Sequence, residues 1–123
     1  MRIYCDPSVL IPLYIEEPAS ARIRTFVLRH SPVVLLNDLQ ELELRNGIRQ
    51  KAMRKDVTEA IATRSLRLLD DDCIAGIVVR KPLVWAAVYA RAEELSRRVA
   101  NRRVCRAFDL LHVATIRTTA HKS

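Results

Sequence analysis

The sequence predicts an α/β fold with a parallel β-sheet, and three observations lead to this prediction. Short runs of strand-forming residues alternate with longer helical patterns along the whole chain. Residues 33–36 form a continuous apolar run between turn residues, which is typical of a central parallel strand buried on both faces. Half of the 123 residues are hydrophobic, which is enough to bury a proper core. We therefore expect a single domain that covers residues 1–123.

The first half of the chain is expected to contain two strands and three helices. A strand over residues 2–5 leads directly into a helix, for which Asp6 is a good N-cap and Pro7 a good first residue. The Glu-Glu-Pro sequence at 16–18 ends this helix, and a second helix is predicted over 19–29. After the strand at 33–36, Asn37 and Asp38 cap a helix over 39–53.

The second half begins with a predicted helix over 57–69 and three consecutive acids at 70–72, interpreted as a solvated helix end. A short strand is expected over 76–80, and Pro82 opens a long helix over 83–99. That helix carries an apolar stripe typical of a core or a dimer surface: Trp85, Val88, Tyr89, Ala92 and Leu95. Residues 104–107 then lead into a last helix that begins at Phe108.

Charge and composition restrict the possible partners and functions. The formal net charge of +7 and the pI of about 9.9 fit a polyanionic partner such as nucleic acid, or an acidic protein. No run approaches a membrane span, and Asp6 and Pro7 interrupt the start before a signal sequence could develop, so we expect no membrane partner and a cytoplasmic location. The three separated cysteines are expected to be reduced thiols. The absence of glycine-rich phosphate loops disfavours kinases, P-loop NTPases and dehydrogenases.

Three acidic residues stand out as candidate ligands, and each also has a structural interpretation. Asp6 is either a helix cap or a metal ligand, and the two roles are compatible because a carboxylate has two oxygens. Glu43 either pairs with an arginine or faces a cleft, whereas Glu41 is expected to pair with Arg45 at the surface. Asp109 either caps the last helix or points inward, because its helical neighbours are mostly apolar: His112, Val113 and Ile116. His112 itself is interpreted as a core histidine.

Together, the three acids favour a metal site. They come from separate elements, and each lies at an element start or on an inward face. Oxygen ligands alone suit Mg²⁺ or Mn²⁺. With a basic protein surface, the chemistry that this combination favours is metal-assisted hydrolysis of phosphodiester bonds.

Three segments in this order resemble the PIN-domain family, and within it the VapC-type toxins of bacterial toxin–antitoxin pairs: IYCDPSVL at 3–10, ELRNGIR at 43–49 and RAFDLLHVA at 106–114. Residues 76–96 are also similar to this subfamily. The resemblance implies a three-layer α/β/α fold around a central parallel sheet. It also implies a metal-dependent endoribonuclease that cleaves tRNA, rRNA or mRNA and leaves a 5′-phosphate.

The resemblance also assigns roles to particular residues. It implies that Asp6, Glu43 and Asp109 are catalytic and hold Mg²⁺ or Mn²⁺, with Ser8 as a supporting hydrogen-bonding residue. It implies a homodimer and a cognate antitoxin whose tail covers the groove of the active site. Such an antitoxin agrees with the positive charge of this chain.

Two departures from the family pattern matter. Pro7 stands where the family more often has a small hydroxyl residue, and no acid follows Asp109, where the family has a further strand with a fourth acid. The sequence is therefore interpreted as a C-terminally truncated PIN domain, with the last strand missing. Two alternatives stay open: a catalytically impaired PIN domain that retains dimer or antitoxin binding, and a simple basic RNA-binding module whose affinity falls with salt.

Overall fold

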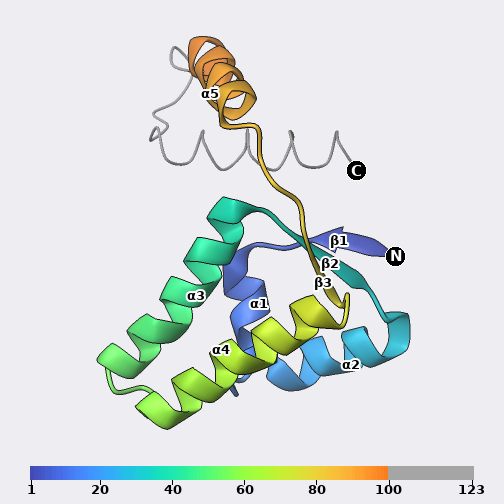
Figure 1. Cartoon of the computed structure of the whole chain (residues 1–123), viewed down its shortest axis with the longest axis vertical. Helices are drawn as coiled ribbons and strands as arrows, with labels where there is room; N and C mark the ends of the chain where they lie inside the picture. Colours follow the sequence, from blue (N-terminus) through green and yellow to red (C-terminus); the bar gives the residue numbers. More distant parts are fainter. Residues whose placement is uncertain (100–123) are drawn as a thin grey trace. The chain divides into compact units, whose positions relative to one another are not determined.

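The computed structural model of the chain describes residues 1–99 (Figure 1). It divides the chain into one unit formed by Met1–Arg80 and a second that begins at Lys81, and each is described by itself. The segment at 104–107, the helix expected from Phe108 onward, Cys105 and Asp109 all lie outside the described residues. The expectation of one domain over the whole chain stays a prediction.

The first unit is an α/β structure with a three-stranded parallel sheet, as the sequence predicts. The strands are β1 (Arg2–Tyr4), β2 (Val33–Leu36) and β3 (Val78–Arg80). Two helices, α1 (Pro7–Tyr14) and α2 (Ser20–His30), connect β1 to β2, and two more, α3 (Asp38–Met53) and α4 (Glu59–Ile74), connect β2 to β3. The strand order is β1-β2-β3, so β2 is central, and Tyr4 lies opposite Leu35 in the register.

The core lies between the sheet and the helices. Val34 and Leu36 alternate along β2 onto the same face as Val78 of β3, because successive strand residues point to opposite faces. They pack in one buried cluster with residues from three helices: Leu10 of α1, Leu44 and Ile48 of α3, and Ala62 and Leu69 of α4. Leu35 points to the opposite face and is also buried, so the prediction of a strand buried on both faces is confirmed. The three-layer arrangement stays a prediction, because these helices account for one layer.

Local signals explain where the helices begin. Asp6 caps α1 with Pro7 in its first turn, and Thr58 Oγ1 accepts a hydrogen bond from the Ile61 amide at the start of α4. At the start of α3, Asn37 and Gln40 form a capping box, in which each side chain accepts from the other residue's amide. The predicted N-cap roles of Asp6 and Asn37 are confirmed.

The predicted end of α4 is wrong. The helix continues through the three acids to Ile74, instead of ending at residue 69. Asp70 and Asp72 both have partners on other elements, because Arg45 of α3 reaches the first and the Tyr14 hydroxyl of α1 reaches the second. Gly76, with a φ of 77°, lies in the left-handed region just after the helix. Arg45 and Tyr14 therefore stabilise a helical last turn rich in carboxylates, although the sequence indicated a solvated helix end.

The second unit contains α5 (Trp85–Val99), which begins two residues later than predicted. Leu83, Val88 and Leu95 are buried in one cluster, against which Trp85 and Ala92 pack. Tyr89 is 60% exposed, so it lies beside the predicted stripe and not within it. Its ring centroid is 6.0 Å from that of Trp85. Within residues 1–99, no helix combines the length and the apolar character needed to cross a membrane.

Candidate metal centre

Asp6 follows the carboxyl end of β1, where open α/β sheets place their functional residues. Its Oδ1 accepts a hydrogen bond of 2.8 Å from the Ser8 amide, and its own carbonyl accepts from the Val9 amide at 2.9 Å. These bonds fix the turn from strand to helix and leave the Asp6 side chain exposed at the edge of the sheet. The helix-cap role is therefore shown, and it is compatible with the ligand role.

Ser8 is brought next to Asp6 by its main chain. The hydrogen bond between them uses the Ser8 amide, and the Ser8 residue is exposed. The Ser8 hydroxyl has no hydrogen bond within the described part of the chain. Its expected supporting role at the metal stays a prediction.

Gln40 joins the start of α3 to the end of β1. Its amide donates to Asn37 Oδ1 at 2.9 Å, and its Oε1 accepts from the Asn37 amide at 3.1 Å. Its Nε2 donates to the Cys5 carbonyl at 3.3 Å, one residue before Asp6. Both Asn37 and Gln40 are buried. The parallel register already places the ends of β1 and β2 at the same edge, and this side chain connects them across it.

Glu43 lies one helical turn after Gln40 and is half-buried. Residues three apart share a helix face, so Glu43 lies on the side of α3 that Gln40 directs towards β1. One turn further, a Cβ at Gly47 would lie 2.8 Å from Cδ1 of Ile11, which shows that α1 and α3 approach closely there. The structure thus brings together the elements that carry Asp6 and Glu43. Asp109, the third predicted ligand, lies outside the described residues.

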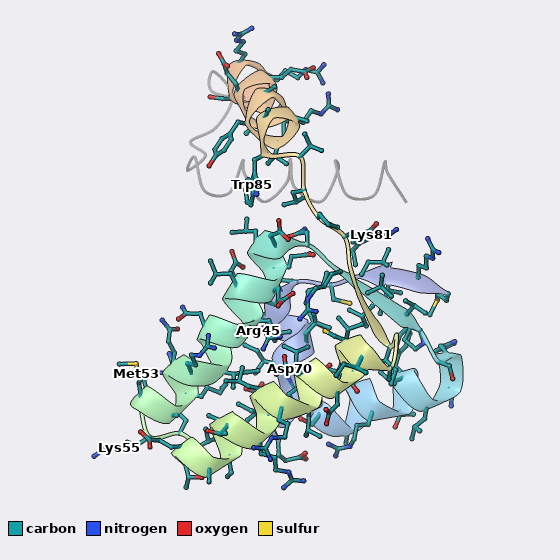
Figure 2. All side chains as sticks on the ribbon, viewed as in Figure 1. Arg45, Met53, Lys55, Asp70, Lys81 and Trp85 are labelled. Atoms are coloured by element: carbon teal, nitrogen blue, oxygen red, sulfur yellow. The ribbon has the colours of Figure 1, made fainter. Side chains whose placement is uncertain are left out.

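Glu41 belongs to an ion-pair network that the sequence revealed only in part. Its carboxylate accepts from Arg45 Nε at 3.0 Å, as predicted, and also from Arg80 Nε at 2.6 Å. Arg45 Nη2 also donates to Asp70 Oδ1 of α4 at 2.7 Å. Figure 2 shows these two side chains between α3 and α4. The hydrogen bond from Arg80 is the main cause that lowers the pKa of Glu41, and the bond from Arg45 adds to it.

Glu41 lies at the surface, as predicted, but two arginines partly cover it and its side chain is 21% exposed. The spacing of four residues was sufficient to predict the Arg45 pair. No local pattern connects Asp70 to Arg45 or Arg80 to Glu41, because each pair is distant in the sequence. Their pairing depends on how β3 and α4 fold back against α3.

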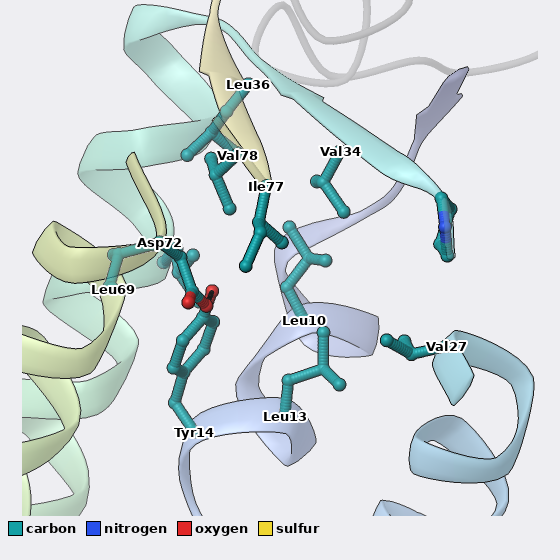
Figure 3. A pocket seen from close by; sticks show the side chains of 12 residues that line it. Leu10, Leu13, Tyr14, Val27, Val34, Leu36, Leu69, Asp72, Ile77 and Val78 are labelled. Carbon is teal, nitrogen blue, oxygen red and sulfur yellow. Dashed lines mark hydrogen bonds between the residues drawn. The ribbon is translucent and has the colours of Figure 1, made fainter. Parts of the chain in front are cut away.

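Apolar hollows lie among the described residues of the first unit. A groove of about 380 Å³ is lined by residues of β1, β2, α1 and α2, and Arg22 is the charged residue among them. A smaller cavity of about 100 Å³ lies among α1, α2, α3, α4 and the strands β2 and β3. Figure 3 shows Tyr14 and Asp72 at one side of this cavity, where the hydroxyl donates to Asp72 Oδ2 at 2.7 Å. Burial, and then this bond, raise the pKa of Tyr14 well above its usual value.

The donor atoms of the predicted ligands suit a hard cation. The positions of these ligands agree with a metal site only in part. Asp6 and Glu43 supply carboxylate oxygens, which Mg²⁺ and Mn²⁺ prefer. Within residues 1–99, no three histidine, cysteine or acidic side chains form a group that could hold a metal ion. The described residues therefore do not by themselves form a three-carboxylate centre, and the ligand role of Asp109 stays a prediction.

No protein-family model, no curated protein and no solved structure matches this chain.

Proposed function

We propose that this protein is a metal-dependent endoribonuclease of the PIN type and the toxin of a toxin–antitoxin pair. The observation that carries the proposal is the Gln40–Cys5 hydrogen bond, which joins the elements bearing Asp6 and Glu43 at the carboxyl edge of a parallel sheet. Open α/β sheets bind their ligands at this edge, which supports a site built from acids on these two elements. The resemblance of the segments around Asp6, Glu43 and Asp109 to the family supplies the rest of the assignment.

In this proposal Asp6, Glu43 and Asp109 hold Mg²⁺ or Mn²⁺ in their ionised forms. Such an ion, held by these carboxylates, would activate a water molecule and offset the negative charge on the leaving oxygen. The helix start at Asp6 keeps one carboxylate oxygen directed at the Ser8 amide, which orients the side chain. Gln40 and Asn37 keep the first turn of α3 beside it.

The distribution of charge supports RNA as the substrate. Met1–Arg80 contains twelve basic and eleven acidic residues and is almost neutral. Lys81–Ser123 contains nine basic and three acidic residues, so it carries nearly all of the net charge of +7. Basic residues attract the phosphate backbone independently of base sequence. The proposal therefore assigns most of the affinity for the backbone to Lys81–Ser123.

The groove beside β1 supports an antitoxin as partner. It is lined by apolar side chains from β1, β2, α1 and α2 and has one cation, Arg22. An amphipathic acidic segment would match both properties, because its apolar side chains would fill the groove and its carboxylates would pair with Arg22. The groove also includes Cys5 and Val9, on either side of Asp6 in the sequence. Homodimer formation is part of the same proposal.

The decisive experiment is cleavage of end-labelled RNA by the full-length protein. We expect cleavage with Mn²⁺, and none with EDTA or with Asp6→Asn, because both remove metal coordination. Asp71→Asn is the matched control, since Asp71 is an exposed acid with no ion pair in the described residues, and it should cleave like the wild type. Cleavage that persists in EDTA would contradict the proposal. A folded wild type that neither cleaves RNA nor binds Mn²⁺ in calorimetry would favour the impaired, partner-binding alternative.

A further inference from the structure

We propose that Gln40 is a positioning residue that sets the separation between Asp6 and Glu43. The inference rests on the proposed metal centre and extends it, because Gln40 contributes no charge and is not one of the predicted ligands. It concerns how the site is held in shape before any ion binds.

The contacts of Gln40 give it two functions at once. Its Oε1 completes the capping box with the Asn37 amide, and its Nε2 donates to the Cys5 carbonyl on β1. By comparison, the hydroxyl of Thr58, the N-cap of α4, accepts from the Ile61 amide of its own helix. Gln40 is therefore more than a helix cap, since it connects two elements that are 35 residues apart in the sequence.

The burial of Gln40 protects its two side-chain hydrogen bonds from water. Gln40 is 3% exposed, so water cannot easily replace either side-chain bond. An apolar residue of similar length would leave the Asn37 amide and the Cys5 carbonyl without these bonds. A buried polar group that loses its partner destabilises the folded state by more than the net value of one hydrogen bond.

The geometry explains why the carboxylates depend on this bond. The Cys5 carbonyl immediately precedes Asp6, and Glu43 is three residues beyond Gln40 on the same helix face, a rise of about 4.5 Å. The path from one carboxylate to the other thus passes through one hydrogen bond and a rigid helical turn. A divalent ion needs its ligands within about 0.2 Å of ideal distances. A loose connection at Gln40 would weaken the site without removing a ligand.

The test compares Gln40→Met with two controls in the full-length protein. Thr58→Ala removes a helix cap of similar value at the start of α4, and Gln50→Met makes the same chemical change at an exposed position on α3. Mn²⁺ affinity is measured by calorimetry. Without metal, hydrogen exchange of the Ser8 and Val9 amides is followed by NMR, because both amides donate to Asp6.

We expect Gln40→Met to weaken Mn²⁺ binding at least tenfold and to speed exchange of both amides about fivefold, a factor that corresponds to one net hydrogen bond. Thr58→Ala should lower thermal stability without either effect, and Gln50→Met should behave like the wild type. Affinity and exchange that are both unchanged in folded Gln40→Met would overturn the inference. Failure of the wild type to bind Mn²⁺ would contradict the proposed function instead, and the exchange measurement would still decide the role of Gln40.

Gln40→Glu is the second variant, for use in the exchange measurement if Gln40→Met does not fold. It keeps an acceptor for the Asn37 amide and so preserves the capping box. At a pH at which its carboxylate is ionised, this side chain cannot donate to the Cys5 carbonyl, so exchange at Ser8 and Val9 should still increase. Unchanged exchange in this variant would also overturn the inference.

Discussion

Carboxylates of the same chemical type behave differently in this protein because their neighbours differ. Asp6 is an exposed helix cap whose Oδ1 accepts from the Ser8 amide. Glu41 is mostly buried and bound by two arginines, whereas Glu43, two residues later, lies on a different side of α3. Successive residues on a helix point in different directions, so neighbouring acids in the sequence can have unrelated roles.

At the residue scale, Glu41 should make the stability of the protein depend on pH. Arg80 and Arg45 lower its pKa in the folded state, while its unfolded value is about 4.3. The stabilisation is therefore complete above about pH 5 and is lost as the pH falls below 4 towards the folded pKa. We expect Glu41→Gln to be less stable than the wild type at pH 7 and the difference to shrink between pH 5 and pH 3, in urea unfolding followed by circular dichroism.

Asp71→Asn is the control for this pH profile, because Asp71 has no ion pair among the described residues. Its stability should follow that of the wild type as the pH falls. A difference between Glu41→Gln and the wild type that stays constant from pH 7 to pH 3 would show that the arginines do not lower the pKa of Glu41.

At the scale of elements, the close approach of α1 and α3 depends on Gly47. A Cβ there would lie 2.8 Å from Cδ1 of Ile11, which is too close without a shift of one side chain. Alanine in a helix interior is otherwise more favourable than glycine by about 1 kcal/mol. The two effects oppose each other in Gly47→Ala, so the neighbouring side chain decides the outcome.

We expect Gly47→Ala to stabilise the protein more in an Ile11→Val background than in the wild type. Valine lacks the Cδ1 atom that an alanine Cβ would contact. In that background the higher helix propensity of alanine should therefore stabilise the protein without a steric clash. Urea unfolding of the four proteins in this double-mutant cycle should give a coupling of at least about 0.5 kcal/mol. Additive effects would mean that the two helices are further apart than the structure indicates.

Local sequence signals were most reliable for the starts of elements. The apolar run at β2 and the caps at Asp6 and Asn37 are where the sequence predicts them, because each depends on neighbouring residues only. The end of α4 was predicted wrongly, since Arg45 and Tyr14 are far away in the sequence and hold its last acids in place. Gln40 gave a partial signal, the capping-box spacing, but its bond to Cys5 required the packed structure.

At the scale of the whole molecule, the positive charge is unevenly distributed. The sheet-containing unit is nearly neutral, and the excess of basic residues begins at Lys81. Some of this charge is locally compensated, because Arg97 and Arg98 of α5 pair with Glu93 and Glu94. Such exposed pairs are weak and screened by salt, so they do not prevent an arginine from contacting a phosphate.

We expect the double variant Arg97→Gln/Arg98→Gln to bind RNA more weakly than a double variant with the same net charge, Arg64→Gln/Arg67→Gln on α4. All four arginines are exposed, so the two variants test position and not total charge. The slope of log affinity against log salt should decrease by about 0.7 for each phosphate of single-stranded RNA that an arginine no longer neutralises. Equal slopes in fluorescence-anisotropy titrations would show that RNA binding does not depend on Arg97 and Arg98 in particular.

The sequence by itself determined the fold class, the central strand, the helix caps and the excess of basic residues near the C-terminus. All of these follow from composition, from periodicity or from residues within one helical turn of each other. Only the tertiary structure decided which distant groups meet: Gln40 with Cys5, Glu41 with Arg80, and Asp72 with Tyr14. The physical reason is that these contacts form when separate elements pack on one face of the sheet, and no local pattern encodes the packing partner.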